Sequence, residues 1–204
     1  MAEVAAIVLA AGRSTRFSGG AEGATKLVAE IDGVPLVRLA VEVAIGSGAA
    51  PVIVVTGHAR DKVMAVLAGL DVREARNPDF ASGIAASLKA GIAAVPDTSS
   101  AALVFLGDMP RVTAALAQKL IAAFESDPSQ DAVAPVIDGR RGNPVLLSRR
   151  LFAAAMNLAG DEGARRLLMR PELRVGEIAV ADSGAAFDVD TPEALLFPGG
   201  RGGD

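Results

Sequence analysis

The chain has 204 residues, with 20 Lys and Arg, 24 Asp and Glu, and a formal net charge of −4. This length suits one large α/β domain, and 51% hydrophobic with only 3% aromatic residues predicts a core of Ala, Val, Leu and Ile. The acidic balance argues against long polynucleotides as partners. The absence of cysteine excludes disulfides, thiolate zinc sites and cysteine nucleophiles. With no apolar run of ~18 residues and no secretory signal, we expect a cytoplasmic protein that does not bind membranes.

Short apolar runs alternate with longer amphipathic ones, which is typical of βαβ units and a mainly parallel sheet. Ligands bind in such sheets over the carboxyl ends of the strands. We expect one domain over residues 1–196 and a flexible glycine-rich tail over 197–204. The predicted strands are Val4–Leu9, Val52–Thr56, Val72–Glu74, Ala102–Leu106, Ala132–Pro135, Pro144–Leu147 and Val175–Val180. The predicted helices are Pro35–Ser47, Arg60–Ala68, Ile84–Ala94, Thr113–Ser126, Arg149–Leu158 and Gly163–Met169.

The first predicted strand ends in small residues that are followed by cations. Ala10, Ala11 and Gly12 leave room for a base and a phosphate to approach the main chain, and Gly12 also permits positive φ. Three cations follow, Arg13, Arg16 and Lys26, and the last two are suited to neutralise phosphate charge. The glycine-rich run 18–24 between them is expected to become ordered over a ligand. The pattern indicates a nucleotide-binding segment; the alternative is a glycine-rich turn with solvated arginines.

A second polar segment follows the third predicted strand and leads into a helix. Asn77, Gly83, Ser87 and the free N–H groups of the helix start could bind a base, sugar hydroxyls or a phosphate. The alternative is an Asn-Pro turn with a Ser cap. His58, the only histidine, follows the second predicted strand and is interpreted as structural rather than catalytic.

Carboxylates lie at the ends of two later apolar segments. Asp108 follows a strand at the expected crevice and is a candidate ligand for Mg²⁺, unless it only caps the following turn. Asp188 and Asp190 would share one side of an extended segment, although Thr191-Pro192 also resembles a helix start that one of them could cap. We expect Asp190 to be the second metal ligand, with Asp188 secondary.

Cations and glycines also cluster between residues 140 and 166. Arg141 and Asn143 lie in the first group and Arg165 in the second, and such groups could bind a second, anionic substrate. The alternative for Arg165 and its neighbour Arg166 is a solvated helix face.

Together these motifs resemble the family of molybdenum cofactor cytidylyltransferases and guanylyltransferases, over nearly the whole chain to about residue 196. The segments that carry the resemblance are Leu9–Phe17 with Lys26, Asn77 with Gly83 and Ser87, Gly107–Pro110, Gly142–Pro144, Gly160–Arg165 and Asp190–Pro192. The first of these is shared by many sugar-phosphate and alcohol nucleotidyltransferases, whereas Gly107–Pro110 and Gly160–Arg165 are more specific. The family usually has Met-Gly where this chain has Phe17-Ser18.

The resemblance implies a single Rossmann-like, three-layer α/β domain with a mixed sheet. The implied reaction transfers CMP from CTP to a molybdopterin-type phosphate and releases pyrophosphate, with Ala11 in place of a second glycine favouring CTP over GTP. It further implies that Leu9 to Gly12 hold the base and ribose, that Arg16 and Lys26 act on the triphosphate, and that Asp108 and Asp190 hold Mg²⁺. The implied acceptor-binding residues are Arg141, Asn143 and Arg165.

Three alternatives remain open from the sequence. A guanylyltransferase of the same family would differ in the base, and a cytidylyltransferase for a sugar or alcohol phosphate would differ in the acceptor. A nucleotide-binding module that delivers a cofactor to a molybdoenzyme or its chaperone would release no pyrophosphate.

Overall fold

The computed structural model describes residues 3–14, 17, 25–180, 189 and 191. Its main sheet has the strand order β10-β7-β9-β6-β1-β4-β5, and β8 pairs with β7. The strands are β1 Val4–Ala10, β4 Val52–Thr56, β5 Arg73–Arg76, β6 Ala101–Leu106, β7 Ala132–Ile137, β8 Arg140–Arg141, β9 Val145–Ser148 and β10 Val175–Ala179. The pairs β1–β4, β1–β6, β4–β5 and β7–β10 are parallel, whereas β9 runs antiparallel to β6 and β7. The expected mixed, mainly parallel sheet is confirmed.

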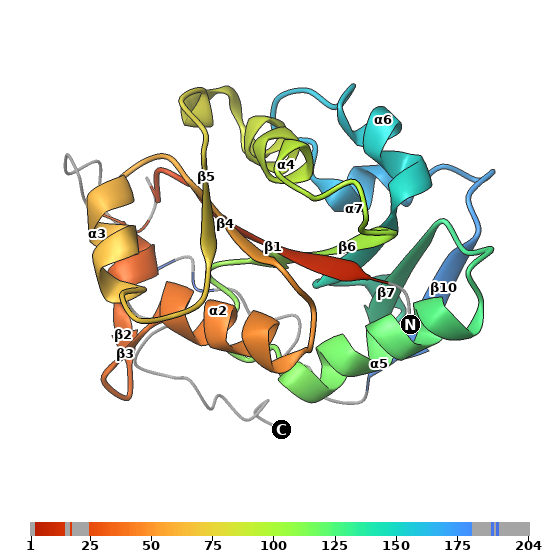
Figure 1. The fold of residues 1–204 in the computed structure, drawn as a ribbon, viewed down its shortest axis with the longest axis horizontal. Helices are drawn as coiled ribbons and strands as arrows, with labels where there is room; N and C mark the ends of the chain where they lie inside the picture. The colour runs from red at the N-terminus through yellow and green to blue at the C-terminus, as the bar shows by residue number, and fades with distance from the viewer. Residues whose placement is uncertain (1–2, 15–16, 18–24, 181–188, 190, 192–204) are drawn as a thin grey trace.

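Helices cover both faces of this sheet, which gives the expected three layers (Figure 1). In that view α2 and α5 lie below the strands, and α4, α6 and α7 lie above them. The helices are α2 Leu36–Gly46, α3 Arg60–Val66, α4 Ile84–Ala93, α5 Ala114–Ser126, α6 Phe152–Ala155 and α7 Ala164–Leu167. Within the described residues, no helix is long and apolar enough to span a membrane.

Strand β1 is buried along its whole length and divides the core in two. Its alternate residues point to opposite faces, because successive side chains of a strand do so. Val8 and Ala10 pack in the core on the α2 and α5 side, together with residues such as Leu120. Ile7 and Leu9 pack in the core on the α4 and α7 side. The end of β1 therefore presents Leu9, and not Ala10, to the α4 face.

Two short hairpins were not among the predicted elements. One joins β2 Glu30–Ile31 to β3 Val34–Pro35, and the other joins β7 to β8. Their turns are Asp32-Gly33, with φ of 53° and 79°, and Asp138-Gly139, with φ of 49° and 73°. Two successive positive φ values are what a two-residue hairpin of type I′ requires, and Asp-Gly is a preferred sequence for it. The two Asp-Gly dipeptides were therefore sequence signals for these hairpins.

The late helices are shorter than predicted. The predicted helix 149–158 is a 3₁₀ turn, η3 Arg149–Leu151, followed by the single turn of α6, and the predicted helix 163–169 is reduced to α7. Two further 3₁₀ turns, η1 Lys26–Val28 and η2 Phe80–Ser82, begin segments that line the site. The expected tail 197–204 lies outside the described residues.

Candidate functional site

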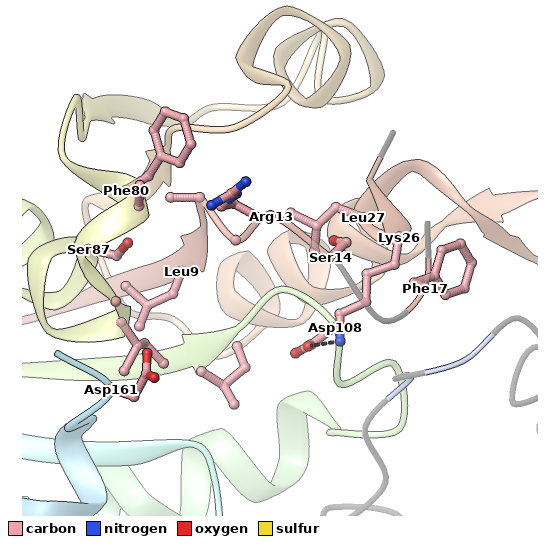
Figure 2. Close-up of a pocket in the computed structure, with 16 residues that line it drawn as sticks. Leu9, Arg13, Ser14, Phe17, Lys26, Leu27, Phe80, Ser87, Asp108 and Asp161 are labelled. Atoms are coloured by element: carbon pink, nitrogen blue, oxygen red, sulfur yellow. Dashed lines mark ion pairs between the residues drawn. The ribbon is translucent and has the colours of Figure 1, made fainter. Parts of the chain in front are cut away.

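A cavity of about 460 Å³ opens where the carboxyl ends of β1 and β6 meet the first turns of α4 (Figure 2). The two strands are neighbours in the parallel part of the sheet, so the segments that leave them lie at one edge. The candidate residues in its wall are Leu9, Ala11, Gly12, Arg13, Lys26, Gly83, Ser87 and Asp108. The structure thus brings three separate sequence motifs to one place.

The residues that leave β1 divide between the cavity and the core. Leu9 and Ala11 line the cavity, whereas Ala10 is fully buried on the other face of the sheet. A Cβ on Gly12 would have no protein atom within 4 Å, so the main chain there is open to a ligand. The left-handed conformation in this segment occurs at Ser14, with φ of 52°, and not at Gly12.

Lys26 and Asp108 form an ion pair in the wall of the cavity (Figure 2), with 2.7 Å between Nζ and Oδ2. Their side chains are 11% and 21% exposed, so water screens the two charges only partly. Lys26 is held by the start of η1, where Thr25 caps the turn by accepting a hydrogen bond from the Leu27 N–H at 3.3 Å. The Thr25 hydroxyl also lies 3.3 Å from that of Ser14, which ties η1 to the segment after β1.

One contact connects the late acidic segment with this pair. The buried Val189 donates its N–H to the carbonyl oxygen of Asp108 at 3.1 Å. The predicted metal ligand Asp190 and its secondary candidate Asp188 lie outside the described residues. Arg16 and the glycine-rich run 18–24 lie outside them as well.

Asn77 is buried behind Ser87 and is not part of the cavity wall. Its Nδ2 donates to the Ser87 hydroxyl at 3.0 Å, and its Oδ1 accepts from the Asp79 N–H at 2.9 Å. Both ends of the amide are therefore used inside the protein. Asn77 positions Ser87, which does line the cavity, rather than offering its own amide to a ligand.

The start of α4 is occupied by the protein's own groups. Gly83 has φ of +99°, and a Cβ on it would lie 2.2 Å from the carbonyl oxygen of Gly160, so no larger residue fits. The same carbonyl accepts a hydrogen bond from the Ala85 N–H at 3.0 Å. The prediction that these N–H groups are free for a phosphate is therefore wrong at Ala85, because a carbonyl oxygen already fills that position.

A second cavity, of about 640 Å³, adjoins the first, and the two share Leu9, Ile84, Leu106 and Asp161. Its other walls come from β8, the loop after it and α7. The predicted acceptor-binding residues Arg141, Asn143 and Arg165 all line this second cavity, together with Arg140 and Arg166.

The guanidinium of Arg141 is already engaged within the protein. Its Nε donates to Oε1 of Glu177 at 2.8 Å, and its NH1 donates to the Leu168 carbonyl oxygen. These contacts tie β8 to β10 and to the end of α7. Arg141 therefore builds the wall of the second cavity, and its charge is largely compensated by Glu177.

The other arginines of the second cavity differ in whether a carboxylate of the described chain pairs with them. Arg166 forms an ion pair with Glu162, with 3.4 Å between Nε and Oε1. Arg140 and Arg165 make no hydrogen bond or ion pair with any residue that the structure describes. Their charges are uncompensated by the described chain, which makes them the stronger anion-binding candidates.

Sequence reasoning did not assign Ser14, Phe80 or Asp161, although all three line the first cavity. The Phe80 ring rests against that of His58, with 5.9 Å between centroids, and Gly57 makes room for it, because a Cβ there would lie 2.6 Å from the Phe80 Cβ. Asp161 lies inside a segment that the sequence had already singled out. The signal was therefore present for Asp161 but pointed to its neighbour Arg165.

Comparisons with known proteins agree with this arrangement. Residues 6–175 match the family model of the MobA-like NTP transferase domain. Nicotine blue oxidoreductase from Paenarthrobacter nicotinovorans is 30% identical over 198 residues, which cover 94% of each chain. Molybdenum cofactor cytidylyltransferase from Escherichia coli K12 is 31% identical over 120 residues, which cover 59% of this chain and 58% of that protein. The chain spans 33% of the length of the bifunctional protein GlmU from Sorangium cellulosum, which it also matches.

Solved structures show the same architecture. The crystal structure of Rv0371c from Mycobacterium tuberculosis H37Rv has a TM-score of 0.83 and 26% identity, with 96% of each chain covered. A structure of Rv0371c in complex with manganese has a TM-score of 0.79 and 25% identity, with 96% of this chain and 97% of that chain covered. The fold is that of nucleotidyltransferases, and the chain belongs to the family of MobA-like NTP transferase domains.

Proposed function

We propose that this protein is a divalent-metal-dependent cytidylyltransferase that transfers CMP from CTP to the phosphate of a molybdopterin-type acceptor and releases pyrophosphate. The observation that carries the proposal is the pair of adjoining cavities with a common wall, beside the Lys26–Asp108 ion pair. Two substrates held in adjoining cavities suit a direct transfer, because positioning alone contributes much of the acceleration of such reactions. The family membership supports the nucleotidyltransferase class.

The first cavity is the site for the nucleotide in this proposal. The open main chain at Gly12, beside Ala11, receives the base and ribose, and Ser87 offers a hydroxyl from α4. Lys26 and the exposed Arg13 supply positive charge for the triphosphate, and Arg16 is proposed to join them.

The residues present fit a divalent cation. Asp108 offers hard carboxylate oxygens at the cavity, and Mg²⁺ takes one or two carboxylates and completes its shell with water and phosphate oxygens. The described residues hold no cluster of three or more His, Cys, Asp or Glu side chains, which suits a cation held by few protein ligands. Asp190 follows Val189, whose N–H contacts Asp108, and is proposed as the second ligand. When bound, the cation would draw charge from the α-phosphate and the leaving pyrophosphate.

The chemistry asks little of the protein beyond position and charge. An acceptor phosphate oxygen attacks the α-phosphorus, a new P–O bond forms, and the bond to the β-phosphate oxygen breaks with in-line departure of pyrophosphate. A phosphate monoester is already ionised at neutral pH, so no general base is required. His58 is therefore not assigned a catalytic role.

The second cavity is the site for the acceptor. Arg140 and Arg165 have no ion-pair partner among the described residues, and they are proposed to bind the anionic acceptor together with Asn143. Arg141, which the sequence also offered as an acceptor-binding residue, holds the wall in place through Glu177.

A preference for CTP rests on Ala11. Its side chain is 2% exposed, and its Cβ would lie 2.9 Å from a Cβ on Gly57, so the methyl group fills space beneath the base site. A glycine at this position would leave a gap there. The proposal is that the methyl group leaves less space in the base site and so disfavours the larger purine base.

One observation favours a second candidate function. The relative that aligns with 94% of this chain is named an oxidoreductase, so the same cavities could hold a dinucleotide reductant and a planar substrate. A reductase would oxidise NADH or NADPH and release no pyrophosphate.

The test is a pyrophosphate-release assay of the purified protein with a molybdopterin-type acceptor, Mg²⁺ and each of CTP, GTP, ATP and UTP. The expected result is release that needs the acceptor and the metal and is fastest with CTP. Faster release with GTP than with CTP would change the proposed base from cytosine to guanine. Release only with a sugar or alcohol phosphate would change the proposed acceptor. No release with any pair would contradict the transferase, and NAD(P)H oxidation in parallel samples would favour the reductase.

A further inference from the structure

We propose that Asp161 is a substrate-binding residue whose carboxylate accepts hydrogen bonds from a pair of O–H or N–H donors on a substrate. The proposal rests on the function proposed above and adds a recognition element to it. The residue stands in the wall that the two cavities share.

The Asp161 carboxylate is exposed, and it lines both cavities. It makes no hydrogen bond or ion pair with any residue in the described ranges. Its neighbour Glu162, in contrast, is paired with Arg166. Figure 2 shows Asp161 on the side of Leu9 and Ser87, apart from the Lys26–Asp108 pair.

Two glycines with positive φ shape the main chain beside this side chain. Gly83 has φ of +99° and Gly160 has φ of +56°. The Gly160 carbonyl accepts a hydrogen bond from the Ala85 N–H at 3.0 Å, and Oδ1 of Asp161 lies 2.9 Å from where a Cβ on Gly83 would be. The carboxylate therefore lies close to the start of α4.

A fixed negative charge between two anion sites restricts what can bind beside it. A phosphate group would be repelled, so Asp161 must face the parts of the substrates that carry no charge. A carboxylate accepts hydrogen bonds on both oxygens and suits two adjacent donors. The substrates of the proposed reaction offer such pairs in two places, the 2′,3′-diol of the ribose and the amino-pyrimidinone edge of a pterin.

Isothermal titration with Mg²⁺ present tests this on the full-length wild type and Asp161→Asn. The ligands are CTP, 2′,3′-dideoxy-CTP and a phosphate-free 6-hydroxymethylpterin. Asp161→Asn should weaken binding of CTP or of the pterin about 10- to 100-fold, because hydrogen bonds to a charged group are strong. If the ribose is the partner, CTP loses affinity while the dideoxy analogue binds both proteins alike. If the pterin is the partner, the pterin loses affinity and CTP does not.

Glu172→Gln is the matched control, because Glu172 is an exposed carboxylate outside both cavities and its loss changes the net charge equally. It should bind all ligands like the wild type. Affinities of Asp161→Asn for CTP and the pterin both within twofold of this control would overturn the role of Asp161 and leave the proposed function standing. A wild type that binds neither CTP nor the pterin would remove the proposed function itself.

Discussion

The two cavities share a wall but are built by different parts of the sheet. The first lies over the ends of the parallel strands β1 and β6, and the charges of Lys26 and Asp108 face each other across its wall. The second shares residues of β1 and β6 but is completed by α7 and by β8, which runs antiparallel to β7. There, Arg141 and Arg166 are paired with carboxylates of the same chain, and Arg140 and Arg165 are paired with none that the structure describes.

This difference teaches where the chemistry and the selectivity reside in the proposed function. In the parallel half, Asp108 follows the end of β6, and the capped turn η1 brings Lys26 to it. In the antiparallel half, pairing between distant residues decides which arginines remain available. We therefore expect changes in the first cavity to affect the transfer step, and changes in the second to affect the acceptor.

The largest effect is expected at the ion pair. Lys26→Ala and Asp108→Asn should each lower turnover about 10²- to 10³-fold, because each removes charge stabilisation at the reacting phosphates. The measurement is steady-state pyrophosphate release, with circular dichroism to check the fold. Lys119→Ala, an exposed lysine on α5, is the control and should keep the wild-type rate. A near-normal rate in either site variant would show that its assigned role is wrong.

The next effect concerns the wall between the cavities. Gly83→Ala should lower the free energy of unfolding by about 2–4 kcal/mol, since it adds a clash with Gly160 to the cost of a positive φ. It should weaken ligand binding in both cavities at once. Gly69→Ala, with φ of +84° and no atom within 4 Å of the new Cβ, should lose only about 1 kcal/mol. Urea denaturation measures both, and equal losses would rule out the contact with Gly160 as the cause.

A smaller effect should separate neighbouring arginines. Arg165→Ala should raise the KM for the acceptor about 10-fold, because it removes a free cation that makes charge-assisted hydrogen bonds. Arg166→Ala removes a cation that already pairs with Glu162 and should change this KM by less than about threefold. The KM for CTP serves as the internal reference and should stay constant in both. The reverse order of the two variants would contradict the distinction between free and compensated arginines.

The smallest effect is expected on stability, at an ion pair outside both cavities that has a structural role only. Hydrogen bonds from Arg60, at 2.7 and 2.6 Å, hold the pKa of the Glu74 carboxyl below its ordinary value of 4.5. The pair therefore stabilises the fold fully above pH 4.5, and this contribution is lost as the pH falls through the lowered pKa. The difference in unfolding free energy between wild type and Glu74→Gln should be constant from neutral pH down to this region and then shrink. A difference that grows in acid would contradict the assignment.

The sequence predicted the parallel half of the molecule well. Strands such as Val52–Thr56 are buried apolar runs, and their pattern alone marks them. The position of Asp108 beside the segment that follows β1 was also predicted, because the ends of parallel strands meet at one edge. The short hairpins were missed although Asp32-Gly33 and Asp138-Gly139 marked their turns.

Pairing between distant residues could not be predicted. The sequence offers Arg141 and Arg165 as equivalent cations, and only the fold shows that Glu177 compensates the first. In the same way, the sequence makes Asn77 a plausible base-binding residue. The structure shows that its amide is hydrogen-bonded to the Ser87 hydroxyl and the Asp79 N–H instead. Such contacts depend on tertiary packing and not on local pattern.

The most direct test of the central claim, that the first cavity binds a nucleoside triphosphate with a divalent cation, is a thermal-shift titration. CTP, GTP, ATP and UTP are titrated with and without Mg²⁺, because a ligand that binds the folded state raises its apparent stability. The account predicts a Mg²⁺-dependent rise in Tm that is largest for CTP and is lost in Lys26→Ala. The absence of any shift with all four nucleotides at millimolar concentration would contradict it.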